Sequence, residues 1–527
     1  MGCCSTSRGD ARLRIAKYLL VVIVLLTVVS WLSVYAYGRF AAHARGRPSE
    51  SIPPAADVTA LDRVFGRMAD DRPDQSGLAL IAEDVGAFAA RAHAARAAGR
   101  SLDLQYYYWR DDLTGGLLTR EVLAAADRGV RVRILLDDIN TRGDDSLLAA
   151  LDSHPRIEVR LFNPAINREG ALGRGAEMLL RFVTVTRRMH NKAWIADGRL
   201  AIVGGRNIGD AYFGAARDAN FRDLDVLMLG TVVTSTASIF DRFWNSPAVL
   251  PVASLADGRG EGLLRLRTRL DRLAHSRQAD AYLSQLEDDE AAARASAERF
   301  TFHWTAEAEI ISDPPEKVLG VGQQGWLDTA ILPTIASARQ TLELISPYFI
   351  PGDEGIAMLK GMTERHVSVS VLTNSLAATD VAAVHGAYAP YRPDLLAAGV
   401  HLFELRPDGG PRRFSLFGSS SASLHTKAFT VDGIAGFVGS FNFDPRSISL
   451  NTEMGLVFRD RPLASALEQE FATHTDPKHS YRLGLESGRI VWTEEHGSQV
   501  GNHDPDASLW RRFVAVVTGL LPLESQL

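Results

Sequence analysis

The sequence predicts an α/β protein of two tandem, pseudo-symmetric sandwich domains, preceded by one N-terminal transmembrane helix. The first observation is a ten-residue segment written twice, as MHNKAWIADG ending at Gly198 and as LHTKAFTVDG ending at Gly433. The second is that strand-like segments matched between the halves, such as 129–136 and 366–373, alternate with Ala- and Leu-rich helical stretches. The third is a long uncharged run near the N-terminus.

Length and composition support this organisation. A chain of 527 residues is too long to form a single hydrophobic core of ordinary size, so two domains are expected. A net charge of −6 argues against an extended nucleic-acid surface, which needs a basic face. The only cysteines, Cys3 and Cys4, precede the apolar run, so the globular part has neither a disulfide nor a cysteine metal site.

The N-terminal run from Tyr18 to Gly38 contains no charged residue. At about 1.5 Å per residue it spans the ~30 Å hydrocarbon core of a bilayer. It is long for the apolar core of a signal peptide, and no small-x-small cleavage site ends it, so we favour an uncleaved anchor.

The residues on either side of this run indicate how the chain is oriented in the membrane and whether its N-terminus carries a lipid. Four basic residues precede it and three follow it, which favours a cytoplasmic N-terminus with the large domains on the extracytoplasmic side of the cell (inner) membrane. The opening MGCCST fits an N-myristoylation pattern with palmitoylatable cysteines, but we prefer a disordered tail.

The duplicated motif has a geometric meaning. Its apolar, β-branched flanks predict a strand, and residues i and i+2 of a strand share a face. His190 and Lys192 therefore project together, as do His425 and Lys427. Two copies face to face would make a cationic cavity with two imidazoles.

That cavity suits a phosphodiester. The lysines would hold the phosphate oxygens, while one histidine attacks phosphorus and the other handles the proton. A metal site is the sharper rival, but an ammonium on the same face repels a cation, and no ligand-type cluster accompanies either copy. We therefore predict no metal.

Each motif continues into a turn and a second strand. Asp197 and Asp432 precede glycine at a predicted hairpin turn, which they would stabilise. Asn207 and Asn442 follow near the end of the next strand, close to the same pocket. Arg206 either adds charge for a lipid headgroup or is simply exposed.

These residues resemble the paired HKD motifs of the phospholipase D superfamily, over residues 75–475. The resemblance implies a two-step reaction through a phosphohistidine, with no cofactor. It implies His190 as nucleophile, His425 as acid and base, and a pentavalent phosphorane stabilised by the motif lysines and asparagines. Asp197 and Asp432 belong to the motif mostly as supporting residues.

Further supporting residues complete the expected site. A histidine that carries charge needs a carboxylate on its other nitrogen. The resemblance places acidic residues downstream of each histidine, so we assign this orienting role to Asp223 and Glu453, with Asp225 as an alternative to Asp223. Ser440 lies within the second motif's continuation.

Within the superfamily the chain resembles the bacterial cardiolipin synthases, particularly the cardiolipin synthase C-like branch. The resemblance rests on the anchor, on SPYFIP (346–351), on the region from Trp304 to Lys317, and on NFDPRS (442–447). It implies phosphatidyl transfer to phosphatidylglycerol, with phosphatidylethanolamine or a second phosphatidylglycerol as donor. The alternatives are a phospholipase D hydrolase releasing phosphatidic acid, a nucleic-acid phosphodiesterase and a non-enzymatic membrane scaffold. The sequence does not identify a protein partner.

The expected boundaries follow from composition. An Arg-, Glu- and Ala-rich stretch separates the halves and predicts a charged surface helix. The apolar segment 509–523 is too short to span a membrane; it either lies in the membrane interface or packs on the domain. We expect a tail (1–17), an anchor (18–38), a linker (39–75), domain 1 (76–250), a helical connector (251–305), domain 2 (306–475) and a C-terminal extension (476–527).

Overall fold

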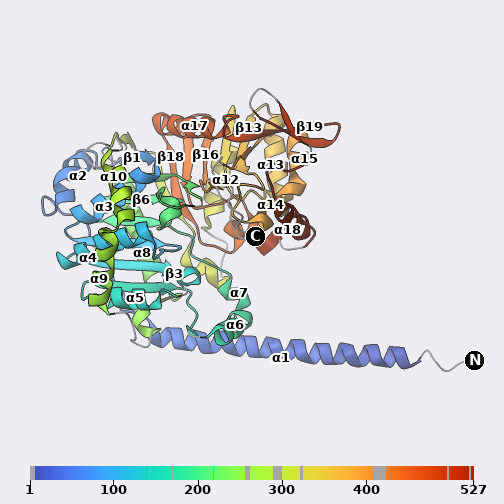
Figure 1. The fold of residues 1–527 in the computed structure, drawn as a ribbon, viewed down its shortest axis with the longest axis horizontal. Coiled ribbons are helices and arrows are strands. Elements are labelled where there is room, and N and C mark those ends of the chain that lie inside the picture. Colours follow the sequence, from blue (N-terminus) through green and yellow to red (C-terminus); the bar gives the residue numbers. More distant parts are fainter. Residues whose placement is uncertain are drawn as a thin grey trace, which may run out of the picture.

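The computed structural model describes residues 6–527, except 142, 169, 218, 256–261, 289–299, 321–324, 408–422, 495–497, 502, 522–523 and 527. The two cysteines and the acylation pattern therefore lie outside the described residues. The chain forms two α/β halves side by side, and a long N-terminal helix runs along the first half and projects beyond the body (Figure 1).

The N-terminal half is built on a nine-stranded mixed sheet of order β10-β1-β8-β6-β5-β2-β3-β4-β9. Its centre is parallel across β2, β3 and β4, whereas β5 and β6 form the antiparallel hairpin of the first motif. The strands are β1 (Ser76–Ile81), β2 (Ser101–Tyr106), β3 (Arg131–Asp137), β4 (Ile157–Phe162), β5 (Ala193–Ala196), β6 (Leu200–Gly204), β8 (Asp225–Gly230), β9 (Val249–Pro251) and β10 (His303–Thr305).

The C-terminal half repeats this arrangement. In its sheet the order β11-β18-β17-β16-β12-β13-β14 corresponds strand for strand to β1-β8-β6-β5-β2-β3-β4, and β19, β20 and β21 extend the far edge. The strands are β11 (Ala308–Ser312), β12 (Thr341–Ile345), β13 (Ser368–Asn374), β14 (His401–Leu405), β16 (Ala428–Val431), β17 (Ala435–Gly439), β18 (Met454–Arg459), β19 (Ser480–Glu486), β20 (Arg489–Thr493) and β21 (Gln499–Gly501). The predicted class, two tandem pseudo-symmetric α/β domains, is confirmed.

Helices cover the outer faces and also join the halves. On the first half, α3 (Asp84–Ala97) and α4 (Leu113–Asp127) bury their alanine- and leucine-rich faces against the sheet. On the second, α12 (Leu327–Ala336), α13 (Gly352–Glu364) and α15 (Arg392–Ala397) do the same. Between the halves, α8 (Thr231–Trp244) and α17 (Arg461–Thr475) share one apolar core with strands of both sheets, which fixes the two motifs relative to each other.

The N-terminal helix α1 (Thr6–Ala44) is longer than the predicted anchor. Its stretch from Ala16 to Ala44 is long and apolar enough to cross a membrane, and none of its most apolar window is buried. The hydroxyl of Ser30 donates to the carbonyl of Leu180, and Arg181 lies over the ring of Tyr37, so the second part of α1 rests on α6 (Ala171–Leu180). After a turn-rich segment, α2 (Ala60–Asp70) leads into β1.

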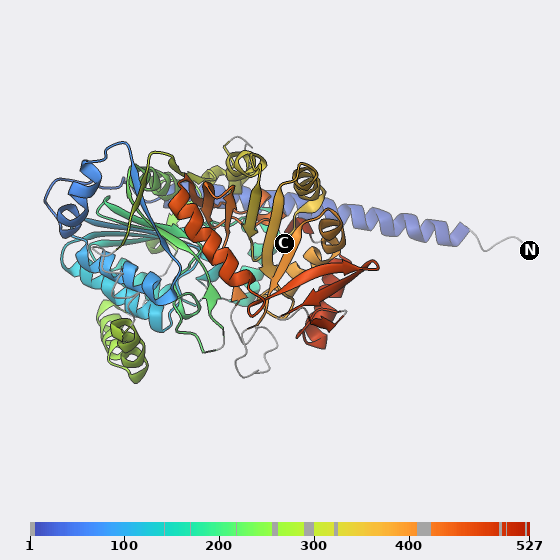
Figure 2. The same ribbon diagram turned by 90° about the horizontal axis from the view of Figure 1, so that it is seen from above.

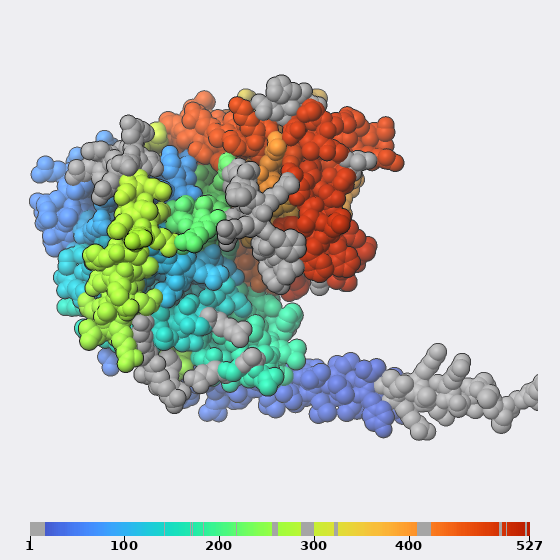
Figure 3. Space-filling model, in the orientation of Figure 1, coloured from blue at the N-terminus to red at the C-terminus, as the bar shows by residue number. Residues whose placement is uncertain are grey.

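The described part of the connector between the halves includes the helices α9 (Leu263–Ala274) and α10 (Arg277–Asp288). Leu266 and Leu270 of α9 are buried against the first half, and the charged side of α9 pairs with that half through ion pairs to Asp111 and Asp127. Figure 3 shows both helices, in yellow-green, over the outer surface of the N-terminal half. They lie away from the junction of the two halves (Figure 2).

Candidate active site

The two motif histidines lie just before their strands, where the halves meet. The backbone amide of His190 donates to the carbonyl of Thr452 at 2.8 Å, and that of His425 donates to the carbonyl of Arg222 at 2.9 Å. A short parallel pair, β7 (Phe221–Arg222) with β15 (Ser423–Leu424), reinforces the second contact. Each histidine is therefore anchored by the backbone of the opposite half.

The side chain of each histidine is also bound by the opposite half. The Nδ1–H of His190 donates to Oε2 of Glu453 at 2.8 Å, and the Nδ1–H of His425 donates to Oδ2 of Asp223 at 2.6 Å. Each carboxylate belongs to the other half. Asp225, the alternative partner, instead pairs with Arg91 at 2.9 Å.

Behind Glu453 lies a small hydroxyl cluster. The hydroxyl of Ser440 donates to the Glu453 carboxylate at 2.5 Å, and that of Ser447 donates to its other oxygen at 3.2 Å. Ser440 is fully buried and is not among the residues that line the cavity, and its hydroxyl holds the Glu453 carboxylate.

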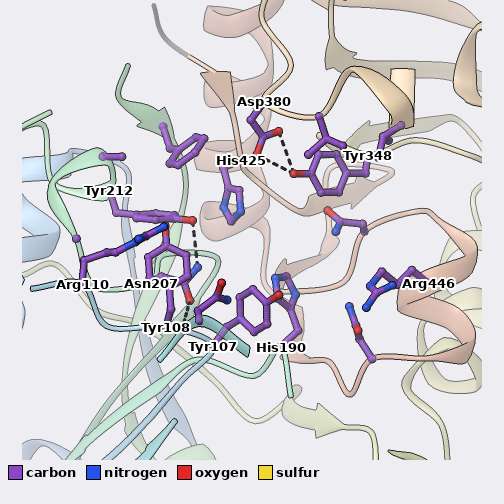
Figure 4. Close-up of a pocket in the computed structure, with 18 of the residues that line it drawn as sticks. Tyr107, Tyr108, Arg110, His190, Asn207, Tyr212, Tyr348, Asp380, His425 and Arg446 are labelled. Carbon is purple, nitrogen blue, oxygen red and sulfur yellow. Dashed lines mark hydrogen bonds between the residues drawn. The ribbon is translucent and has the colours of Figure 1, made fainter. Parts of the chain in front are cut away.

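The two histidines line one cavity of about 980 Å³ and approach it from opposite walls (Figure 4). Tyr107 meets the His190 ring edge-on with centroids 5.0 Å apart, and Tyr212 meets His425 in the same way at 5.2 Å. The remaining walls are aromatic and acidic, and include Tyr108, Tyr348, Phe221, Asp111, Asp112, Asp144, Asp210, Asp380, Asp444, Arg110 and Arg446.

Both motif lysines are buried, and each contacts the backbone of the histidine two residues before it. The ammonium of Lys192 donates to the backbone carbonyl of His190 at 2.5 Å, and that of Lys427 donates to the carbonyl of His425. Burial lowers the pKa of Lys192 to about 7 and that of Lys427 to about 8.

Burial also sets the charge of the imidazoles. It lowers the pKa of His190 to about 4 and that of His425 well below its usual range, and the neighbouring lysines act in the same direction. At neutral pH both rings are therefore neutral before an anion binds. With Nδ1–H given to a carboxylate, the lone pair lies on Nε2.

The two motif asparagines line the cavity, as the sequence predicts. The amide of Asn207 donates to the hydroxyl of Tyr212 at 3.1 Å. The side-chain oxygen of Asn442 is buried and accepts no hydrogen bond from the part of the chain that the structure describes. A buried polar atom of this kind is available to a ligand.

The motif aspartates do not reach the cavity. Asp197 follows β5, at the opposite end from His190, and its carboxylate accepts hydrogen bonds from the backbone amides of residues 99–101 at 2.7–3.2 Å. Asp432 accepts from the amides of residues 339–341 in the same way, and both aspartates have φ 54°. These residues tie each hairpin turn to the start of the central strand, so they contact no reacting group.

We expect Asp197→Ala to lower the free energy of unfolding by about 2–4 kcal/mol, because it leaves three amides without their charged acceptor and puts alanine at positive φ. Turnover per folded molecule should stay within about threefold of the unsubstituted protein, since the cavity is untouched. Thermal unfolding in detergent and initial rates measure the two effects. Asp197→Asn is the matched control, because asparagine keeps one oxygen and tolerates this conformation; a loss of turnover without a loss of stability would contradict the assignment.

Arg206 fits neither reading that the sequence allows. It is completely buried, and its guanidinium donates to the carbonyls of Ile81, Ala82 and Tyr212 and to the carboxylate of Asp84. Arg206 therefore has a structural role. It holds the loop that carries Tyr212 against the end of β1, and it is neither exposed nor placed to bind a headgroup.

Sequence reasoning misses the aromatic and acidic walls. The hydroxyl of Tyr348 donates to the carboxylate of Asp380 at 2.8–2.9 Å on the cavity wall. A signal for two of the tyrosines exists, because Tyr108 and Tyr348 occupy matching places at the ends of the repeated segments 99–109 and 339–349. Nothing in the local sequence marks Asp380.

Comparison with known proteins places this site in a family. Residues 92–244 and 331–475 match the family described as "Cardiolipin synthase, PLD-like domain". Cardiolipin synthase C of Escherichia coli (strain K12) is 41% identical over 87% of this chain and 97% of its own length. An uncharacterised Helicobacter pylori (strain J99) protein is 31% identical over 88% and 92%. The crystal structure of phosphatidylserine synthase from Haemophilus influenzae Rd KW20 shares the fold, with TM-score 0.54 and 13% identity over 79% of this chain and 91% of that one.

Two copies of one α/β domain with facing motifs define a phospholipase D superfamily enzyme. The chain belongs to the cardiolipin synthase family of that superfamily. The expectation of a cardiolipin synthase-like phosphatidyltransferase is thus confirmed at the level of the family, as a phospholipid-modifying enzyme.

Proposed function

We propose that this protein makes cardiolipin by transferring a phosphatidyl group to phosphatidylglycerol through a phosphohistidine. The observation that carries the proposal is the convergence of two crossed imidazole–carboxylate pairs on one cavity. The identity shared with a protein named cardiolipin synthase C supports the choice of reaction.

The first step uses the two histidines in different roles. Nε2 of His190 attacks phosphorus, and the bond from phosphorus to the leaving headgroup oxygen breaks. His425, protonated once the anionic substrate offsets the lysine charges, gives its Nε2 proton to that oxygen. Glu453 stabilises the charge that develops on His190.

The second step reverses these proton movements. His425, now neutral, takes the proton from a hydroxyl of phosphatidylglycerol, and the hydroxyl oxygen attacks phosphorus. The bond from phosphorus to Nε2 of His190 then breaks, which restores the free imidazole. Asn207 and Asn442 line the space around the phosphorane, and the buried lysine charges stabilise it.

The acidic wall favours phosphatidylethanolamine as the donor. Among the residues that the structure describes, six aspartates and two arginines line the cavity besides the histidines. A cationic ethanolamine headgroup gains from these carboxylates, whereas a second phosphatidylglycerol does not.

We place the enzyme in the cell (inner) membrane as a single-pass protein. The apolar length of α1 supports anchoring, and the excess of basic residues before it supports a cytoplasmic N-terminus with an extracytoplasmic catalytic body.

A lipid-product assay tests the proposal. Purified full-length protein with phosphatidylglycerol, with and without phosphatidylethanolamine, should form cardiolipin, and more of it when both lipids are present. Phosphatidic acid as the dominant product would instead support the hydrolase, and cardiolipin formation unaffected by loss of both histidines would exclude the mechanism.

The buried lysines predict a pH dependence. An ammonium is charged below its pKa and neutral above it, so Lys192 and Lys427 lose charge as pH rises through about 7 to 8. We expect kcat/KM for an anionic phospholipid to fall over this range, because the free enzyme then attracts the phosphate less. At saturating substrate kcat should fall at higher pH, since the bound anion keeps the lysines protonated. A kcat/KM that rises steadily to pH 9 would contradict this account; rates at constant ionic strength measure it.

A further inference from the structure

The C-terminal helix α18 (Leu509–Gly519) is held firmly by one side. Its Ala515 packs against α14 (Ala382–Tyr388), where a Cβ on Gly386 would meet the Ala515 carbonyl oxygen at 2.3 Å. Arg511 donates from Nε to the carbonyl of Leu376 at 2.8 Å, and Ser508 caps the first turn. The helix is therefore docked, and its orientation on the body is fixed.

The other side of α18 is apolar and exposed. Phe513 is 57% exposed and stacks on Trp510, which is 55% exposed, with centroids 5.6 Å apart. At helical spacing the same face carries Leu509, Val516, Val517 and Leu520, all exposed. Six exposed apolar side chains on one face of a docked helix indicate a surface that binds a partner.

The end of the chain beyond α18 contributes to the catalytic cavity. The 3₁₀ turn Glu524–Gln526 follows α18, and Gln526 lines the cavity. Arg446, also in the wall, donates to the carbonyl of Gln526 at 3.0 Å and to that of Thr186 at 2.6 Å.

Across Arg446 lies a second exposed apolar surface. Thr186 follows α7 (Phe182–Val185), which continues from α6. Leu179 of α6 is 72% exposed and Phe182 of α7 is 53% exposed. Since α6 contacts α1, this surface is continuous with the proposed anchor.

We propose that α18 and the α6–α7 surface together dock on the lipid bilayer and seat the cavity rim at the level of the headgroups. The inference rests on the proposed anchoring by α1. In both views α18 lies on the side of the body toward which α1 projects (Figures 1 and 2). An apolar helix face of this kind inserts into the interface between headgroups and acyl chains.

Depth measurements on the full chain test the proposal. Cys3 and Cys4 are replaced by serine, and a single cysteine at Phe513 or Leu179 carries a nitrobenzoxadiazole label. The protein is reconstituted in vesicles of phosphatidylcholine and phosphatidylglycerol with brominated acyl chains. The matched control is Leu264→Cys on α9, an exposed leucine on the side of the body away from the projecting end of α1. The His190→Ala background is used throughout, so the result does not depend on turnover.

We expect bromolipid quenching at 513 and 179 to exceed that at 264 by about threefold or more. Val516→Cys replaces Phe513→Cys if the latter lowers the unfolding temperature. Quenching at 513 equal to that at 264 would overturn the proposal. A blue-shifted emission at 513 without bromolipid quenching would also overturn it, because it would identify a protein, such as a second copy of this chain, as the occupant. Protein that fails to float with the vesicles would remove the anchoring on which the inference rests.

Discussion

Replacing His190 with alanine should lower lipid turnover by about four orders of magnitude or more, because the imidazole is the proposed nucleophile and no described neighbour can replace it. His425→Ala should cause a comparable loss with natural lipids, since an alkoxide leaves slowly without a proton. Cardiolipin formation measured against lipid standards gives both values.

An activated donor separates the two roles. The p-nitrophenol ester of phosphatidic acid needs no proton to leave, so His425→Ala should release p-nitrophenol in a first turnover, while His190→Ala should not. The phosphorylated imidazole should then accumulate in the His425 variant and be trapped on His190. His401→Ala, at an exposed histidine that begins β14, is the control and should keep full activity. Trapping of phosphate on His425 would reverse the assignment.

The second large effect concerns the crossed carboxylates. Asp223→Asn should impair His425, and Glu453→Gln should impair His190, each by about 10²–10⁴-fold, because each amide leaves its imidazolium without a countercharge. The activated donor should therefore rescue the first turnover of Asp223→Asn but not of Glu453→Gln, although Asp223 shares its half with His190.

Controls keep this test specific. Glu354→Gln, at an exposed glutamate in the first turn of α13, should leave both reactions intact. Thermal unfolding of each variant separates the loss of a countercharge from a loosened junction, since both carboxylates are buried there. Rescue of Glu453→Gln instead of Asp223→Asn would mean that each carboxylate serves the histidine of its own half.

Much of this site could be predicted because the residues that form it lie close together in the sequence and the same pattern occurs twice. The alternation of a strand places His190 and Lys192 together, and a second copy of the pattern implies a second, facing set. The role of Asp197 at its turn follows from Asp-Gly in the same way.

The sequence could not predict the contacts that depend on the tertiary structure. The exchange of Asp223 and Glu453 depends on how the halves dock, and no spacing along the chain encodes it. Arg206 shows the converse. A charged residue beside a motif suggests a role in ligand binding, yet the guanidinium of Arg206 is buried and donates its hydrogen bonds to three backbone carbonyls. The sequence also does not show that each lysine is buried against the backbone carbonyl of its own histidine, outside the residues that line the cavity.

The swap of hydrogen-bond partners across the junction has a consequence for biosynthesis. A nascent chain that has completed only its first half carries a histidine whose countercharge has not yet been translated. Under the proposed mechanism, such an intermediate lacks the countercharge of His190 and cannot attack the bilayer beside which it is being made. Under the same mechanism, activity requires both halves to be folded against each other, so the duplication would prevent lipid cleavage by an incomplete chain.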